Sequence, residues 1–296
     1  MMSVAATGFF DGVHLGHQKV VRAVCSKAEE LGAESQIVTF WPHPRSVLQQ
    51  QAYDLRLLTS LQEKQKLFTD LGIDKVTVLD FTKEFSRLST EQFVKRYLIE
   101  RCGVTHLVVG YDHKIGHDTS ETQQQMIQTC KDCGLEVFRV EEFILADQVI
   151  SSTKIRRMLE SGNVEGAAGF LGRRYGLRGV VIVGNHLGRT IGFPTANLGL
   201  YDPLKLIPGN GVYAVKVALG RQTYKGICNI GVRPTVNSGS NISIETHILD
   251  FDEDIYGLDL ELEFVGRIRS EQKFSGLDTL KLQLEKDKVD SLRFFS

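Results

Sequence analysis

The sequence predicts an α/β fold that is followed by a smaller β fold. Strand-like apolar runs alternate with helix-length stretches up to about residue 150, and short strands follow one another after about residue 170. The 296 residues are enough for two domains. Alternating strands and helices imply a parallel sheet with crossover helices, whereas closely spaced strands favour a small antiparallel barrel.

The first half contains five strand-like runs, at residues 4–9, 36–40, 76–81, 106–110 and 136–140. Helix-length stretches lie between them, at residues 16–31, 60–71, 89–102 and 121–133. A glycine, which tolerates the positive φ of a helix stop, follows each helical stretch: Gly32, Gly72, Gly103 and Gly134. Parallel sheets bind ligands at the carboxyl ends of their strands, so the loops after Phe9, Phe40 and Gly110 are the first candidates for a site.

The second half follows a helix expected at residues 153–161 and a join at residues 166–172. We therefore expect domains at 1–171 and 172–296. Strands are expected at residues 177–183, 212–219, 224–230, 242–249 and 258–265. The last of these alternates apolar and acidic side chains, which is the period of a half-buried antiparallel strand. Residues 277–292 return to helical spacing and predict a terminal helix.

Composition excludes several classes of protein. The chain has 35 Lys and Arg against 36 Asp and Glu, and proteins that hold nucleic acid usually carry a basic excess. It has no run of about 18 apolar residues, as a transmembrane helix would need, and no start typical of a signal peptide. Five scattered cysteines suit the reduced thiols of a cytoplasmic protein. Cys130 and Cys133 lack the second pair that a structural zinc site needs, so we interpret them as helix-end thiols.

The sequence GFFDGVHLGH, at residues 8–17, lies between the first strand and the first helix. Two histidines three residues apart at a helix start fall on one side of it, and the first-turn N–H groups favour an anion there. Glycines let the backbone approach a ligand closely. The pattern predicts a phosphate site. The alternatives are a metal site made by Asp11, His14 and His17, or two surface histidines.

Two further segments of the first half carry polar groups. ISSTKIR, at residues 150–156, places hydroxyls and cations at a helix start, where they serve either as ordinary caps or as a second anion site. Asp112 follows a buried strand. Its carboxylate could hold Mg²⁺ or a nucleotide hydroxyl, or it is a loop acid.

The β half carries two candidate segments. A glycine-rich loop at residues 184–190 departs from a P-loop in its spacing and is not followed by a helix. Thr195 and Asn197 follow it with oxygen atoms that can coordinate a hard cation, although a turn-rich connection would look similar. Glu245 lies on the strand face opposite Ile244, either as an exposed glutamate or as a general base.

Together these motifs resemble those of the bacterial bifunctional riboflavin kinase/FMN adenylyltransferase family, in the family's order and over essentially the whole chain. Residues 14–17 and 150–156 resemble the HxGH and ISSTxIR signatures of nucleotidyltransferases, and TFWPHP at 39–44 resembles their flavin-specific branch. GFPTAN at 192–197 and SIETHI at 243–248 resemble riboflavin kinase. The resemblance implies a Rossmann-like nucleotidyltransferase domain, followed by a small antiparallel β-barrel kinase domain with a terminal helix.

In the first domain the resemblance implies that His14 and His17 steady the ATP phosphates and the charge that develops during transfer. Pro42, His43 and Pro44 would help to wall the flavin site. No protein nucleophile is needed, because the FMN phosphate attacks the α-phosphorus of ATP directly. The other nucleotide-binding residues implied are Gly8, Phe9, Asp11, Gly16, Asp112, Ser151, Ser152, Thr153 and Arg156.

In the second domain the resemblance implies that Glu245 takes the proton from the ribityl 5′-hydroxyl as this oxygen attacks the γ-phosphate of ATP. Thr195 and Asn197 would hold Mg²⁺. Arg269 and Glu271 would contact the flavin. The residues implied for ATP are Gly184, Gly188, Arg189 and Tyr256.

We therefore expect a cytoplasmic bifunctional enzyme, monomeric or weakly self-associating, that uses ATP and Mg²⁺ to make FMN from riboflavin and FAD from FMN. We expect no nucleic-acid or membrane partner. An alternative keeps the kinase and makes the first domain a nucleotide- or flavin-binding regulator; Asp118 and the start of the chain close to the first strand favour it. A third hypothesis is a metal-dependent hydrolase that uses Asp11, His14 and His17.

Overall fold

The computed structural model describes residues 2–48, 55–111, 113–116, 122–145, 148–184, 188, 191–233 and 241–295. By its internal contacts the chain divides into two compact units, Met1–Ser152 and Thr153–Ser296. Among the described residues, no helix has both the length and the apolar composition that crossing a membrane requires.

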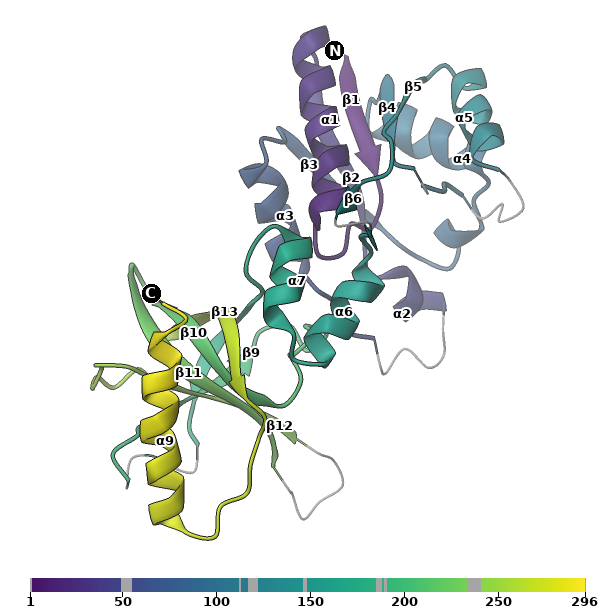
Figure 1. Ribbon diagram of the computed structural model, residues 1–296. Helices are drawn as coiled ribbons and strands as arrows, with labels where there is room; N and C mark the ends of the chain where they lie inside the picture. The colour runs from purple at the N-terminus through teal and green to yellow at the C-terminus, as the bar shows by residue number, and fades with distance from the viewer. Residues whose placement is uncertain are drawn as a thin grey trace. The chain divides into compact units, whose positions relative to one another are not determined.

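The first unit is built on a parallel sheet (Figure 1). In the described part of this unit, its five strands follow the order β3-β2-β1-β4-β5. Their pairing is parallel, as the alternation of strands and helices predicts. The order reverses between β1 and β4, and open α/β sheets bind ligands at such a switch point. The strands are β1 (Ser3–Thr7), β2 (Glu34–Trp41), β3 (Lys75–Asp80), β4 (His106–Val109) and β5 (Glu136–Arg139).

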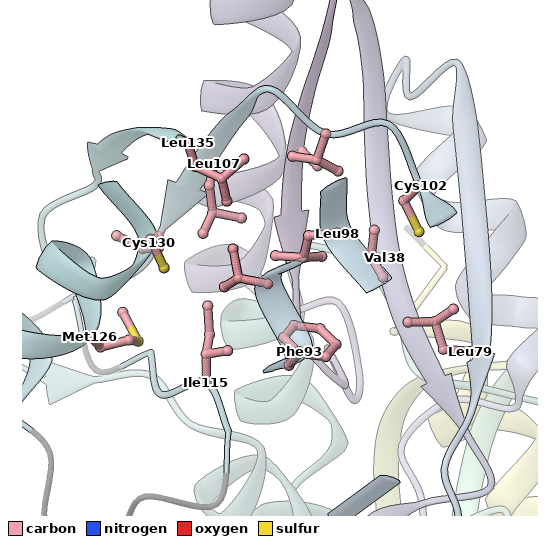
Figure 2. Packing of buried hydrophobic residues seen from close by; sticks show 14 residues of the cluster. Val38, Leu79, Phe93, Leu98, Cys102, Leu107, Ile115, Met126, Cys130 and Leu135 are labelled. Carbon is pink, nitrogen blue, oxygen red and sulfur yellow. The ribbon is translucent and has the colours of Figure 1, made fainter. Parts of the chain in front are cut away.

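Helices cover both faces of this sheet. On β1, Val4 and Ala6 pack with helices α1 (Leu15–Leu31) and α3 (Leu61–Asp70), whereas Ala5 faces the opposite cluster. That second cluster involves α4 (Thr90–Phe93), η3 (Val94–Arg101) and α5 (Gln123–Asp132). Figure 2 shows Phe93 and Leu98 from these helices beside Val38 and Leu79 of the sheet. The alternation of side chains along the strands thus builds a core on each face.

Local sequence signals set the helix ends. Ser60 and Glu63 form a capping box at the start of α3, and the C-terminal cap Gly32 ends α1 in a left-handed conformation. The helix expected at residues 89–102 is present, but it winds as the short α4 and then as the π-helical η3. Four short elements were not predicted: α2 (Pro44–Leu48), η2 (Phe85–Arg87), β6 (Ile144–Leu145) and β7 (Gln148–Val149).

The second unit contains a closed antiparallel barrel, which confirms the predicted architecture. Within the residues that the structure describes, the strands close in the order β10-β11-β12-β9-β8-β13. Helix α9 (Leu277–Leu292) is the predicted terminal helix. The strands are β8 (Gly176–Ile182), β9 (Ala196–Leu200), β10 (Gly211–Leu219), β11 (Gln222–Arg233), β12 (Asn241–Ile248) and β13 (Asp259–Arg269).

The join expected at residues 166–172 is mostly helical. Helix α7 (Val164–Leu171) occupies most of it, after α6 (Ser152–Glu160). Val164, Ala167 and Phe170 are buried on its inner face, which packs against β13. This burial outweighs the low helix propensity of the glycines in the segment. Strand β9 was also missed, because its pairing with β8 and β12 is not visible in so short a segment.

Candidate active sites

The turn between β1 and α1 lies at the switch point of the parallel sheet. Phe10, Gly12 and Val13 adopt positive φ values of 53°, 83° and 40°. For the phenylalanine and the valine this is a strained conformation, which persists only where the surroundings over-determine it and which is common at functional sites.

Several hydrogen bonds hold this turn. The Asp11 carboxylate accepts hydrogen bonds from the backbone N–H groups of Leu58 and Thr59, at 3.0 and 3.2 Å from Oδ1. The Gly12 N–H donates to the Thr59 hydroxyl, and the Ser152 hydroxyl donates to the Asp11 carbonyl at 2.9 Å. Asp11 therefore organises the loop around the turn.

The two histidines lie together, as their spacing predicts. His14 caps helix α1, and its Nδ1 accepts a hydrogen bond from the His17 N–H at 3.3 Å. The two rings stack with centroids 3.6 Å apart. Burial, and then the nearby His14, Lys64 and His113, hold the pKa of His17 well below its usual value. A neutral imidazole at a helix N-terminus can donate a hydrogen bond to a phosphate oxygen.

The geometry does not favour the metal-site hypothesis. The Asp11 carboxylate is engaged by backbone N–H groups of another segment. Among the residues with a described position, no group of three His, Cys, Asp or Glu side chains is arranged to hold a metal ion. The described geometry therefore does not support the hypothesis of a metal-dependent hydrolase that uses Asp11, His14 and His17.

A largely apolar pocket of about 550 Å³ lies at the carboxyl ends of β1 to β4. Phe9 and Pro44 line it, so the predicted loops do meet there. The His43 ring lies edge-on to the Phe9 ring at 4.1 Å, and Pro42 follows β2 directly. Sequence reasoning missed four aromatic side chains that also line the pocket: Phe40, Phe81, Phe85 and Phe93.

The segment at residues 150–156 contributes to both units. Ser151 is exposed and Ser152 contacts the β1–α1 turn through Asp11. Thr153 and Arg156 belong to the second unit, where the threonine is exposed and the arginine is half-buried in the first turns of α6. The predicted site residue Asp112 lies outside the described residues, as does Asp118.

The second unit has a pocket of about 270 Å³ lined by barrel residues and by α9. Glu245, Thr195 and Glu271 line it, together with Arg269. Glu245 is half-buried on β12, and Ile244 is buried on the opposite face, as the alternation predicts. Gly188 lines the pocket too, so the pocket brings together five of the residues expected at the kinase site.

The position of Arg269 depends on a residue that sequence reasoning missed. Its Nε and Nη2 donate to the two carboxylate oxygens of Asp287, at 2.8 and 2.7 Å. Asp287 is completely buried on α9 and also accepts a hydrogen bond from Gln283. A bidentate pair of this kind holds the guanidinium in one orientation. The sequence offered one signal, an aspartate four residues after a glutamine within a helix.

Asn197 lies next to Glu245 in the barrel. The two residues are register partners on β9 and β12. A Cβ atom at Gly184 would overlap the Asn197 amide, so only glycine allows this close approach. The Gly188 carbonyl accepts a hydrogen bond from the Phe193 N–H at 2.8 Å and holds the loop before Thr195. Arg189 lies outside the described residues.

Tyr256 lines a second, smaller hollow of the barrel, of about 60 Å³. Thr195 lines this hollow as well as the pocket beside Glu245. The loop before β9 therefore borders both hollows.

With these two sites the chain falls into the class of two-domain enzymes that transfer phosphorus-containing groups. The family model described as FAD synthetase matches residues 1–154, and the one described as riboflavin kinase matches residues 171–295. The chain belongs to the family of bifunctional riboflavin kinase/FMN adenylyltransferases.

Two relatives carry the name of this family, and one solved structure is similar over nearly the whole chain. The enzyme of that name from Bacillus subtilis is 41% identical over 99% of this chain and 93% of the relative. The one from Escherichia coli K12 is 33% identical over 99% of this chain and 92% of the relative. The crystal structure of a Streptococcus pneumoniae protein named a macrolide-efflux protein is 33% identical, with a TM-score of 0.91 over 98% of this chain and 93% of that chain.

Proposed function

We propose that the second unit phosphorylates riboflavin to FMN, and that the first unit transfers the adenylyl group of ATP to FMN, giving FAD and pyrophosphate. The observation that carries this proposal is that each unit places an apolar-walled pocket beside groups suited to phosphate chemistry. In the first unit these are the aromatic pocket and the His14–His17 pair. In the second they are the pocket against α9 and Glu245.

In adenylyl transfer the aromatic pocket takes the isoalloxazine ring, because planar aromatic ligands bind edge-on or stacked against aromatic side chains. A phosphate oxygen of FMN attacks the α-phosphorus of ATP, the new P–O bond forms, and pyrophosphate leaves with the electrons of the broken bond. His14, His17 and the first-turn N–H groups of α1 donate hydrogen bonds to the phosphate oxygens where charge develops. Gly16 leaves room at this turn, since a Cβ there would crowd the His14 ring.

The remaining ATP-binding assignments of the first site are proposals carried over from the family's motifs. Asp11 and Ser152 hold the turn that receives the phosphates. Gly8 and Phe9 border the aromatic pocket. Hydroxyl and guanidinium groups of the ISSTxIR motif bind the triphosphate, through Ser151, Ser152, Thr153 and Arg156.

In the kinase reaction the Glu245 carboxylate accepts the proton of the ribityl 5′-hydroxyl as that oxygen attacks the γ-phosphorus of ATP, and ADP leaves. Glu245 is a suitable base because it lines the pocket in which the hydroxyl would lie. Arg269 and Glu271 contact the flavin from the same pocket, and Tyr256 contacts the adenine from the smaller hollow.

Mg²⁺ would be held by Thr195 and Asn197. A hydroxyl and an amide carbonyl are oxygen donors of the kind that hard cations prefer. The Gly184 backbone approaches the Asn197 amide too closely for any larger residue, which restricts where that amide can lie. When bound, the ion neutralises charge on the ATP phosphates.

The Arg269–Asp287 pair gives a direct test of the kinase pocket. In Asp287→Asn the guanidinium loses a charged, buried partner, so we expect the KM for riboflavin to rise about tenfold, equivalent to about 1.4 kcal/mol, with a lower thermal stability of the second unit. Steady-state FMN formation and thermal unfolding measure these effects. Asp290→Asn, on the same helix and paired with its neighbour Arg293, is the control and should leave the KM unchanged.

The function itself is tested by incubating the protein with riboflavin, ATP and Mg²⁺, and separately with FMN, ATP and Mg²⁺. We expect FMN, FAD and ADP in the first mixture, and FAD with pyrophosphate in the second. FMN without any FAD would instead support the regulator hypothesis for the first unit.

We also propose a cytoplasmic location, which the free cysteines support, and a chain that acts as a monomer or a weak homo-oligomer. We further propose that the boundary between the two catalytic modules lies at 171/172, and the start of the riboflavin kinase family match at residue 171 supports this.

A further inference from the structure

Lys64 is a buried lysine that none of the assignments above uses. It lies on α3 and is only 1% exposed, although lysine is almost never fully buried. It occupies the first turns of the helix, whose N-terminal end disfavours a cation. Burial lowers the pKa of its ammonium to about 8, with Asp11 opposing that shift. An apolar side chain of similar size would avoid these costs.

The ammonium contacts the residue that joins the two parts of the adenylyl transfer site. Its Nζ donates a hydrogen bond to the Phe9 carbonyl at 2.7 Å and lies 3.8 Å from the centroid of the Phe9 ring. The Phe9 ring lines the aromatic pocket, and its backbone leads into the turn that carries the histidines. Lys64 therefore holds both the backbone and the ring of this one residue.

The same helix supports the next residue of the turn. The Phe68 ring lies edge-on to the Phe10 ring at 5.6 Å, and the Phe10 ring lies edge-on to the His17 ring at 5.3 Å. Phe10 has a positive φ, so the turn needs such contacts to keep its conformation. Helix α3 and the turn thus meet along a continuous set of contacts from Lys64 to His17.

We propose that Lys64 is a positioning residue for adenylyl transfer: its buried ammonium holds the Phe9 carbonyl and ring, and so keeps the strained turn in the conformation that presents His14 and His17 to the phosphates. It also places a positive charge near His17. The titratable groups that act on His17 are His14 from its own segment, Lys64 from α3 and His113 after β4. Removing the positive charge of Lys64 makes protonation of His17 less unfavourable, so the pKa of His17 should rise.

The inference rests on the proposed adenylyl transfer, so the rate at which the unmodified protein forms FAD from FMN and ATP is measured first. Lys64→Met keeps an unbranched side chain of similar volume, one atom shorter, and removes the charge. We expect the kcat for FAD formation to fall about 10- to 100-fold, because small displacements of positioned groups have effects of this size. We also expect the acid limb of the pH–rate profile to move to higher pH. FMN formation from riboflavin should stay within twofold.

Lys66→Met is the matched control, since Lys66 lies on the same helix with an exposed side chain paired to Asp70. It should leave both reactions unchanged. Lys64→Arg retains the positive charge. We expect it to form FAD faster than Lys64→Met does, although arginine is larger than lysine and methionine is not.

The outcomes separate the possibilities. No FAD from the unmodified protein would contradict the proposed function. An active unmodified protein and an equally active Lys64→Met would overturn only the role of Lys64. Loss of the first unit's unfolding transition in Lys64→Met, or a lower rate with an unmoved pH profile and no advantage for Lys64→Arg, would assign the lysine to stability alone and would also overturn it.

Discussion

Glu245→Gln should reduce FMN formation from riboflavin by about 10²- to 10⁴-fold, the usual contribution of a general base. Glutamine keeps the shape of the side chain, so the pocket that it lines with Thr195 should remain intact. What is lost is the carboxylate that accepts the hydroxyl proton. FAD formation from supplied FMN should be unaffected, because the residues proposed for that reaction lie in other segments of the chain.

The two reactions of one preparation provide the internal comparison. Phosphorylation is followed by separation of riboflavin, FMN and FAD, and adenylyl transfer by pyrophosphate release with FMN as substrate. Glu263→Gln, at an exposed position on β13, is the control and should retain full kinase activity. Equal loss of both reactions in Glu245→Gln would contradict a model with two separate sites.

His17→Ala should have the opposite selectivity. In the unmodified protein the His17 imidazole stacks on His14 beside the N-terminus of α1, and burial keeps it neutral and able to donate a hydrogen bond. Removing a preorganised donor of this kind costs about 10²–10³ in kcat. We therefore expect FAD formation to fall by that factor while FMN formation from riboflavin continues, so that FMN accumulates when riboflavin and ATP are supplied.

His106→Ala is the matched control for this prediction. His106 is also buried in the first unit, but it begins β4 and stacks on Phe138, so it lies at the amino end of the strands. The His106→Ala substitution should lower the stability of the first unit and have little effect on the kcat for FAD formation. If His17→Ala retained full FAD formation, the paired histidines would have no role in transfer.

Much of the fold follows from local patterns that remain visible in the linear sequence. The strand-like runs of the first half became β1 to β5 because their side chains are buried on both faces of one sheet. Glycines after the helices became left-handed stops, as at Gly32. The join expected at residues 166–172 is mostly helical because burial of Phe170 and its neighbours against the barrel outweighed the glycines. That burial is a long-range property.

The candidate sites divide in the same way. His14 and His17 were recognisable because both lie in one short segment, and Glu245 because strand alternation placed it opposite Ile244. The roles of Asp287 and Lys64 were not recognisable in the sequence, since each depends on a partner elsewhere in the chain. Asp287 pairs with Arg269, and Lys64 contacts Phe9. For the lysine one signal existed: it lies four residues before the buried Phe68, on the inner face of its helix.

The sequence alone therefore determined the two architectures, their order along the chain, and the phosphate-binding and carboxylate motifs, because each is encoded in residues a few positions apart. Only the tertiary structure decided what surrounds those motifs. It brought Phe40, Phe81, Phe85 and Phe93 from separate segments into one pocket wall. It also buried the ammonium of Lys64 beneath Phe9 and joined Arg269 to Asp287. Such contacts depend on how distant elements pack, and no local spacing in the chain records that.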